Sequence, residues 1–222
     1  MSVESEKIAF TVLIGGKSTR FGSDKGLFEF GGKPLLSHQL NILYKFDKDI
    51  FLVAHSEEQV NEYKKRIRFR ENDIFLIDNL DIVEDKEIRT PMIGLYTAFK
   101  ELDTKGFDKT FVFSCDTPLI KYEVVDLILR QASGYDCYIP RWENFYLEPL
   151  LAIYPVKKAF KMAEKSIKNN IYKLIDLLSE DWRIYYISVE DKIKPLDEKL
   201  HSFININGPI DLEKLMKNFK KE

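Results

Sequence analysis

The sequence predicts an α/β fold with a mostly parallel, twisted sheet that carries helices on both faces. Apolar runs of strand length alternate along the chain with amphipathic stretches of helix length, which is typical of a parallel sheet joined by crossover helices. The runs are nearly continuous in apolar residues, as expected of strands covered on both faces. With 222 residues and 45% apolar side chains, the chain is long enough for one sizeable core.

Each predicted strand is a short apolar run rich in β-branched or aromatic residues. In chain order these runs are Ile8–Ile14, Ile50–Ala54, Ile74–Ile77, Thr110–Ser114, Asp136–Ile139, Leu150–Tyr154 and Arg183–Ile187. Ligands of open parallel sheets bind beyond the carboxyl ends of the strands. The segments that follow these runs are therefore the first places to look for a functional site.

Each predicted helix has apolar residues at helical spacing or a sequence that marks a helix start. Ser56–Gln59 has the sequence of a capping box, which opens the second helix. No repeat, low-complexity segment or Pro/Gly-rich linker interrupts the chain, so one domain over residues 1–222 is expected. The other predicted helices are Leu35–Tyr44, Ile93–Leu102, Val124–Ala132, two helices in series over Lys157–Leu178, and a last helix from Pro209 to the charged tail Lys217–Glu222.

Composition argues against several classes of protein. The formal net charge of -2 does not suit a general nucleic-acid binder. The two cysteines, Cys115 and Cys137, form no CxxC motif and no zinc-ligand spacing with histidine, so neither a disulfide framework nor a zinc site is expected. No apolar run is long enough to span a membrane, and the first residues do not resemble a signal peptide. We therefore expect a soluble, cytoplasmic protein with no membrane or nucleic-acid partner.

The segment Leu13–Pro34 carries the densest functional signal. Glycines let backbone N–H groups approach phosphate oxygens closely, and Lys and Arg supply positive charge. The spacing matches neither a P-loop nor a GxGxxG fingerprint. An ordinary strand-to-helix turn is the alternative, which the two adjacent glycines alone would support about as well, whereas the cations and the later Gly22 favour phosphate binding. The glycines and cations that follow the first predicted strand are Gly15, Gly16, Lys17, Arg20 and Lys25.

A second signal is Asp116, which follows the predicted strand Thr110–Ser114 almost directly. A carboxylate just past the end of a buried strand lies at the mouth of a cleft. Mg²⁺ commonly binds one or two carboxylates together with substrate phosphates. The alternative is that Asp116 caps the helix after Pro118, a common role for an Asp that precedes a Thr-Pro pair.

Together the two loops predict nucleotidyl transfer. The Gly-rich loop would hold a triphosphate, and Asp116 would hold the Mg²⁺ that bridges it. Lys25 and Arg20 would offset the charge that develops on the α-phosphate and on departing pyrophosphate. The protein would mainly position the substrates and stabilise charge.

Six segments, in order along nearly the whole chain, are similar to the motifs of one known family. Leu13–Lys25 (LIGGKSTRFGSDK) resembles the LAGGxSxRMGxDK signature of MobA-type molybdenum cofactor guanylyltransferases, and Gly32–Leu35 continues it as GxPLL. The first signature is specific, and the others gain weight from their order and spacing. Those others are Thr90–Gly94, Ser114–Pro118, Glu148–Tyr154 and Phe203–Leu212, which resemble the family's GPLxG, PCDxP, PLxALY and FxNINTPEDL motifs.

The resemblance implies a single Rossmann-like nucleotidyltransferase domain. It implies transfer of GMP from Mg-bound GTP to the phosphate of molybdopterin, which forms the guanine dinucleotide form of the molybdenum cofactor and pyrophosphate. GTP and molybdopterin are thus the implied substrates, and Mg²⁺ is the implied cofactor. Proteins that donate molybdopterin or accept the finished cofactor are the implied protein partners.

The same resemblance assigns roles to individual residues. On the nucleotide side, backbone atoms of Leu13, Ile14 and Gly15 would meet the guanine or ribose, Gly16 and Arg20 would face the phosphates, Lys25 would contact the nucleotide, and Asp78 matches the family's nucleotide-binding Asp. Asp116 matches the Mg²⁺ ligand, and Asn205 and Asn207 would line the pterin side.

The chain departs from the family's pattern at several positions. Ile14 replaces a small Ala, and Val53 stands where the bacterial enzymes carry an Asn that touches the nucleotide, a hydrogen bond that valine lacks. Thr90 and Gly208 replace the Gly and Thr that precede two family prolines, and the connection from Asp78 to Pro91 is longer than usual. These changes leave phosphate handling intact but concern the base, so CTP stays an alternative to GTP.

Two other functions stay open at this point. One is another nucleotidyl transfer in the same fold, either of a cytidylyl group to molybdopterin or of a nucleotide to a sugar or alcohol phosphate. The other is a non-catalytic carrier of nucleotide and molybdopterin. Loss of Lys25 or Asp116 would favour the carrier, and both residues are present.

Three remaining features of the sequence have a structural interpretation beside a functional one. The basic run Tyr63–Arg70 is expected to be the solvated end of a helix rather than a nucleic-acid contact. Cys115 is expected to be a buried, inert thiol. Trp142, Phe145 and Tyr146 follow a predicted strand, and either stack on a pterin ring or pack against the protein.

Overall fold

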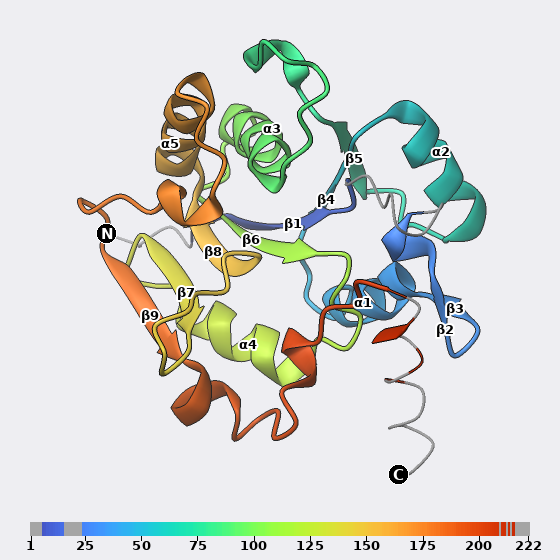
Figure 1. Cartoon of the computed structure of the whole chain (residues 1–222). Coiled ribbons are helices and arrows are strands. Elements are labelled where there is room, and N and C mark those ends of the chain that lie inside the picture. Colours follow the sequence, from blue (N-terminus) through green and yellow to red (C-terminus); the bar gives the residue numbers. More distant parts are fainter. Residues whose placement is uncertain (1–5, 16–23, 209, 212, 214, 216–222) are drawn as a thin grey trace.

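The protein is built around one seven-stranded sheet with helices on both faces, as seen in a computed structural model that describes residues 6–15, 24–208, 210, 211, 213 and 215 (Figure 1). Its strands are β1 (Ile8–Leu13), β4 (Ile50–Ala54), β5 (Ile74–Ile77), β6 (Lys109–Ser114), β7 (Cys137–Arg141), β8 (Leu151–Pro155) and β9 (Ile184–Ser188). Each agrees with a predicted strand to within two residues at either end. The predicted α/β class is therefore confirmed.

The strands lie in the order β5-β4-β1-β6-β8-β7-β9. The pairs β1–β4, β1–β6, β4–β5 and β7–β9 are parallel, whereas β8 pairs antiparallel with both β6 and β7. Among the described strands of this sheet, β8 thus runs against the rest. A separate two-stranded hairpin, β2 (Glu29–Phe30) and β3 (Lys33–Pro34), forms the end of the segment Leu13–Pro34.

Five α-helices cover the sheet in the described part of the chain: α1 (Leu35–Leu43), α2 (Glu57–Arg66), α3 (Pro91–Thr104), α4 (Tyr122–Arg130) and α5 (Val156–Lys168). α3 and α5 pack together on one face, while α1 and α4 lie on the other (Figure 1). Buried side chains of α2 join the same core as those of α1 and α4, so α2 belongs to that second layer.

The helix predictions hold with two refinements. The second helix predicted within Lys157–Leu178 is a short 3-10 turn over Leu174–Leu177. In the capping box, Ser56 Oγ accepts a hydrogen bond from the Gln59 N–H at 3.2 Å, as predicted. Gln59 Oε1, however, accepts from the His55 N–H. Of the last predicted helix, residues 210, 211, 213 and 215 are helical, and Pro209 and Lys217–Glu222 lie outside the described residues.

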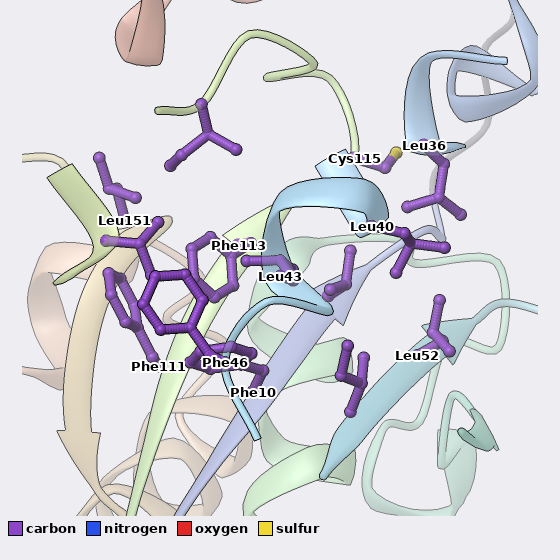
Figure 2. Close-up of a cluster of buried hydrophobic side chains, with 14 of the residues drawn as sticks. Phe10, Leu36, Leu40, Leu43, Phe46, Leu52, Phe111, Phe113, Cys115 and Leu151 are labelled. Carbon is purple, nitrogen blue, oxygen red and sulfur yellow. The ribbon is translucent and has the colours of Figure 1, made fainter. Parts of the chain in front are cut away.

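Packed aromatic rings form the core beneath β1 and β6 (Figure 2). Phe111 and Phe113 stack with ring centroids 4.3 Å apart, and the edge of Phe10 meets Phe113 at 5.4 Å. Such rings contribute roughly 1.5–3 kcal/mol each when fully buried. Leu36, Leu40 and Leu43 of α1 complete the cluster. This dense packing fixes the two central strands, whose carboxyl ends carry the candidate site.

Candidate active site

The Gly-rich segment (residues 14–24) and the Asp116 loop (residues 115–118) start side by side at the ends of β1 and β6. β1 and β6 are neighbouring parallel strands, and their last residues, Leu13 and Ser114, are paired partners. The Cys115 N–H donates to the Leu13 carbonyl at 3.1 Å, which extends the pairing one residue past the strands. The two loops therefore open on the same edge of the sheet, as the sequence predicts.

Lys25 and Asp116 meet at this edge. Lys25 Nζ lies 3.5 Å from Asp116 Oδ2, and it donates a hydrogen bond of 2.8 Å to Asn207 Oδ1. Both charged side chains are largely shielded, with 31% of Lys25 and 17% of Asp116 exposed. Asp116 does not cap the next helix, because α4 begins at Tyr122 with Lys121 as its N-cap residue. The alternative role of Asp116 as a helix cap is therefore excluded.

The segment near the C-terminal end of the described chain reaches the site through main-chain pairing. The Ile206 N–H donates to the Asp116 carbonyl at 2.8 Å, and Ile206 itself is buried. Asn205 and Asn207 flank Ile206, so this single contact brings both amides to the Asp116 loop. The Asn207 N–H is held in turn by Asp211 Oδ2 at 2.9 Å.

A cavity of about 240 Å³ lies beside this ion pair. Its walls combine apolar side chains from the ends of β1 and β4 with charged groups from the loops. Lys25 and Asp116 both line it. The other lining residues are Leu13, Ile14, Gly15, Val53, Asp78, Arg89, Thr90, Pro91, Gly94, Ser114, Cys115 and Leu150.

Main-chain groups of the signature residues are partly engaged within the fold. The N–H groups of Ile14 and Gly15 both donate to the Val53 carbonyl at 2.9 Å. A Cβ on Gly15 would lie 3.3 Å from the His55 nitrogen, so only glycine fits this approach to β4 without a shift. Because those N–H groups are used, hydrogen bonds from this strand end to a nucleotide would come from carbonyl oxygens, which have two lone pairs each.

Asp78 lines the cavity, and the pKa of its carboxyl group is raised. Burial raises the pKa of Asp78 to about 6, and the positive charge of Arg89 partly opposes this effect. A Cβ on Gly94 would lie 3.2 Å from Leu13 Cδ2 and 3.4 Å from Asp78 Oδ1. The first turn of α3 therefore approaches Asp78 closely because residue 94 has no side chain.

Two buried glutamine side chains hold the two loops in place by hydrogen bonds. Gln59 Nε2 donates to the Ile14 carbonyl at 3.0 Å and to Asp24 Oδ1 at 2.9 Å, which bridges the two ends of the Gly-rich segment. Gln39 Nε2 donates to the Ser114 carbonyl at 2.8 Å and to Thr117 Oγ1 at 3.1 Å, which braces the turn that holds Asp116. These side chains are 3% and 0% exposed.

A second cavity of about 300 Å³ adjoins the first. Both cavities share Ser114, Asp116 and Leu150. The second cavity is bounded further by the turn before β8 and by the segment that follows the sheet. Its other lining residues are Thr117, Tyr146, Glu148, Pro149, Leu151, Leu174, Ser202, Phe203 and Asn205.

The structure brings most of the predicted site residues together at one edge. Leu13, Ile14, Gly15, Lys25, Asp78 and Asp116 line the first cavity, and Asn205 lines the second. Asn207 contacts Lys25, while Gly16 and Arg20 lie outside the described residues.

Sequence reasoning missed four polar residues: Gln39, Gln59, Arg89 and Glu148. Arg89 precedes the Thr90–Gly94 motif and Glu148 opens the Glu148–Tyr154 motif, so position beside a motif was an available signal. The glutamines lie on helices remote in sequence from the loops they support; the capping box marks Gln59 only for the start of its own helix, and no local pattern marks Gln39.

The donor set at Asp116 fits a hard divalent cation. Within the described residues, no group of three or more His, Cys, Asp or Glu side chains forms a protein cage for a metal. Mg²⁺ often binds one or two carboxylates and completes its shell with water and substrate phosphates, so one partly shielded carboxylate at the wall of a cavity suits it when phosphates occupy that cavity. Cys115 also lines this cavity, but burial raises the pKa of its thiol to about 12, which keeps it protonated.

Fold and site together place the protein among nucleotidyltransferases, enzymes that hold a nucleoside triphosphate beside a carboxylate at the carboxyl edge of such a sheet. Residues 10–181 match the family of the MobA-like NTP transferase domain, and the chain belongs to that family.

Known proteins of the same family resemble this chain over nearly its whole length. A Pyrococcus horikoshii protein named as a probable molybdenum cofactor guanylyltransferase is 34% identical, over 93% of this chain and 97% of its own. A Thermococcus gammatolerans protein with the same name is 36% identical, over 93% and 97% respectively. The crystal structure of molybdopterin-guanine dinucleotide biosynthesis protein A from Archaeoglobus fulgidus matches with a TM-score of 0.74 and 28% identity, and the match covers 96% of this chain and all of that one.

Proposed function

We propose that this nucleotidyltransferase transfers GMP from Mg-bound GTP to the phosphate of molybdopterin and releases pyrophosphate. The observation that carries the proposal is the pair of adjoining cavities that share Asp116, because group transfer needs two substrates on either side of one phosphate-handling centre. The relatives' names supply the substrates.

In this reaction an oxygen of the acceptor phosphate forms a bond to the α-phosphorus of GTP, and the bond from that phosphorus to the bridging oxygen breaks. Pyrophosphate leaves with the electron pair of the broken bond. The acceptor phosphate is already an anion near neutral pH, so no protein base has to remove a proton. The chain is therefore expected to act through position and charge.

Each described residue near the centre has a task under this proposal. Lys25 would offset the negative charge that grows on the phosphoryl oxygens. Asp116 would hold the Mg²⁺, whose chemistry is charge neutralisation between the phosphates. Asn207 would keep Lys25 at the centre through its 2.8 Å hydrogen bond.

Base choice is proposed to depend on Asp78, the carboxylate in the wall of the nucleotide cavity. Guanine presents an adjacent ring N–H and amino group, both of which donate to a carboxylate. Cytosine presents an amino group next to an acceptor nitrogen, which a carboxylate repels. Asp78 can therefore favour GTP although Val53 supplies no hydrogen bond.

The test is pyrophosphate release by the purified protein with Mg²⁺, molybdopterin and each nucleoside triphosphate in turn. We expect release with GTP and formation of the guanine dinucleotide. Release with CTP in its place would contradict the guanylyl assignment. Tight GTP binding without release, with molybdopterin or with sugar and alcohol phosphates, would indicate a carrier.

A further inference from the structure

The second cavity holds a carboxylate that the reaction itself does not require. Glu148 lines this cavity and not the first, whereas Asp116 lines both. A substrate that spans from the reacting phosphate into the second cavity therefore meets Asp116 with its phosphate end. Its other end reaches the wall that contains Glu148.

Glu148 is fixed in place by its neighbours. Its Oε1 accepts a hydrogen bond of 2.7 Å from Trp142 Nε1, and the Trp142 ring packs on Phe203 with centroids 5.1 Å apart. The Glu148 N–H donates to the Pro140 carbonyl at the end of β7. An ionised carboxylate offers about four lone-pair positions, so this single side-chain contact leaves capacity for a ligand.

The turn that carries Glu148 is itself well defined. Arg141 and Leu147 form an isolated antiparallel bridge, and the Trp142 N–H donates to the Tyr146 carbonyl at 2.9 Å. Phe145 adopts a φ of 67°, a conformation that a bulky side chain rarely takes. The Glu148 carboxylate is therefore presented by a braced hairpin end.

Asp116 has a proposed metal to hold, but a second carboxylate is unexpected in a cavity for a phosphorylated acceptor, because like charges repel. A carboxylate is suited instead to a ligand edge with two adjacent hydrogen-bond donors. Burial also raises the pKa of Glu148, so the group is costly to keep ionised without such donors. Tyr146 and Phe203 supply aromatic surface for a planar ring in the same cavity.

We propose that Glu148 selects the acceptor by accepting hydrogen bonds from a ring N–H and its adjacent amino group, the donor edge of a 2-amino-4-oxo fused heterocycle. This inference rests on the proposed function, because that function assigns the second cavity to the acceptor. Glu148 is then a specificity residue for the ring, while Asp116 and Lys25 serve the phosphate.

Binding of two ring analogues tests the proposal without turnover. 6-Hydroxymethylpterin phosphate has the two-donor edge, whereas in 6-hydroxymethyllumazine phosphate a carbonyl replaces the amino group. Fluorescence titrations with Mg²⁺ and no nucleotide would give both affinities. We expect the wild-type protein to prefer the pterin ester by at least about tenfold, since one hydrogen bond to a charged group is lost and replaced by repulsion.

Glu148→Gln should remove this preference, because the amide can still accept from Trp142 but offers an N–H toward the ring donors. Glu148→Asp keeps the charge and should keep a reduced preference. Glu143→Gln is the matched control, since Glu143 lies exposed on the same turn and makes the same change of charge. That control should behave like the wild type, and all variants should show wild-type thermal unfolding.

Equal wild-type affinity for the two esters, no binding of either, or an unchanged preference in Glu148→Gln would overturn the inference.

Steady-state kinetics separates this inference from the proposed function. We expect Glu148→Gln to raise KM for molybdopterin about tenfold with KM for GTP unchanged. Normal guanylyl transfer with an unchanged KM for molybdopterin would overturn the inference and leave the function intact. A Glu148-dependent pterin preference without any transfer would support the inference and contradict the function.

Discussion

Gln59 donates a 2.9 Å hydrogen bond to Asp24, which lies at the C-terminal end of the Gly-rich segment. The same Gln59 amide group donates to the Ile14 carbonyl, on the strand side of the segment. Lys25 follows Asp24 directly. The position of Lys25 therefore depends on a buried side chain that lines neither cavity.

Gln59→Glu should weaken nucleotide binding about tenfold, because the new carboxylate cannot donate and repels Asp24. Leaving the Ile14 carbonyl unpaired should also lower the free energy of unfolding by about 1–3 kcal/mol. Calorimetric GTP titration and denaturant unfolding measure the two effects. Asn61→Asp, an amide-to-acid change at an exposed site on the same helix, is the control. A stability loss without any change in GTP affinity would show that Gln59 is merely structural.

Lys25→Ala should lower the rate of transfer by about 10²-fold or more, because a positive charge aimed at the reacting phosphates is lost. Single-turnover pyrophosphate release measures this rate. Lys33→Ala removes an exposed lysine on β3 and should have little effect. A near-normal rate for Lys25→Ala would leave this lysine only its structural contacts with Asp116 and Asn207.

Asp116→Ala should abolish metal-dependent turnover while the fold survives, since Ile206 pairs with the main-chain carbonyl of residue 116 and not with its side chain. Mn²⁺ binding in the presence of GTP, followed by electron paramagnetic resonance, reports the metal independently of turnover. Asp47→Asn changes an exposed carboxylate and serves as the control. An active Asp116→Ala enzyme would contradict the metal assignment.

Asp78 should make the protein less stable as pH rises from about 4 to 7. Its pKa is about 6 in the folded state against 3.8 as the ordinary value, so the folded state holds the extra proton in this window. A shift of about two pKa units corresponds to roughly 3 kcal/mol. Asp78→Asn should therefore be more stable than the wild type at pH 7, and the difference should vanish near pH 4. Urea unfolding across pH, with the exposed Asp81→Asn as control, measures this. A pH-independent difference would contradict the raised pKa.

Gly94→Ala should weaken GTP binding severalfold with little change in stability. The new methyl group would press on Leu13 and Asp78, which both line the nucleotide cavity. Replacing a helical glycine by alanine gains up to about 1 kcal/mol of helix propensity, which offsets the crowding. GTP titration and urea unfolding on one preparation separate the effects, and unchanged affinity would show that Leu13 yields freely.

The sheet, the Gly-rich segment and the Asp116 loop could be predicted from the sequence because each is marked by residues that are neighbours in the chain. A run such as Thr110–Ser114 predicts a buried strand by composition alone, and Asp116 follows from its place after that strand. The support by Gln39 and Gln59 could not be predicted, since each acts on main-chain groups that only the tertiary fold brings near. The motif that Glu148 opens marks its position, but not that it shares a cavity with Asp116, because that depends on the antiparallel pairing of β8 with β6.

That reversal has a consequence for how the enzyme can diversify. Because β8 enters the sheet at the edge where β6 leaves it, the turn from Arg141 to Pro149 reaches the second cavity without passing through the parallel half of the sheet. Insertions or replacements in this turn leave the register of β1, β4 and β6 untouched. If the second cavity takes the acceptor as proposed, this turn can change acceptor choice while the residues proposed to handle the phosphates stay as they are.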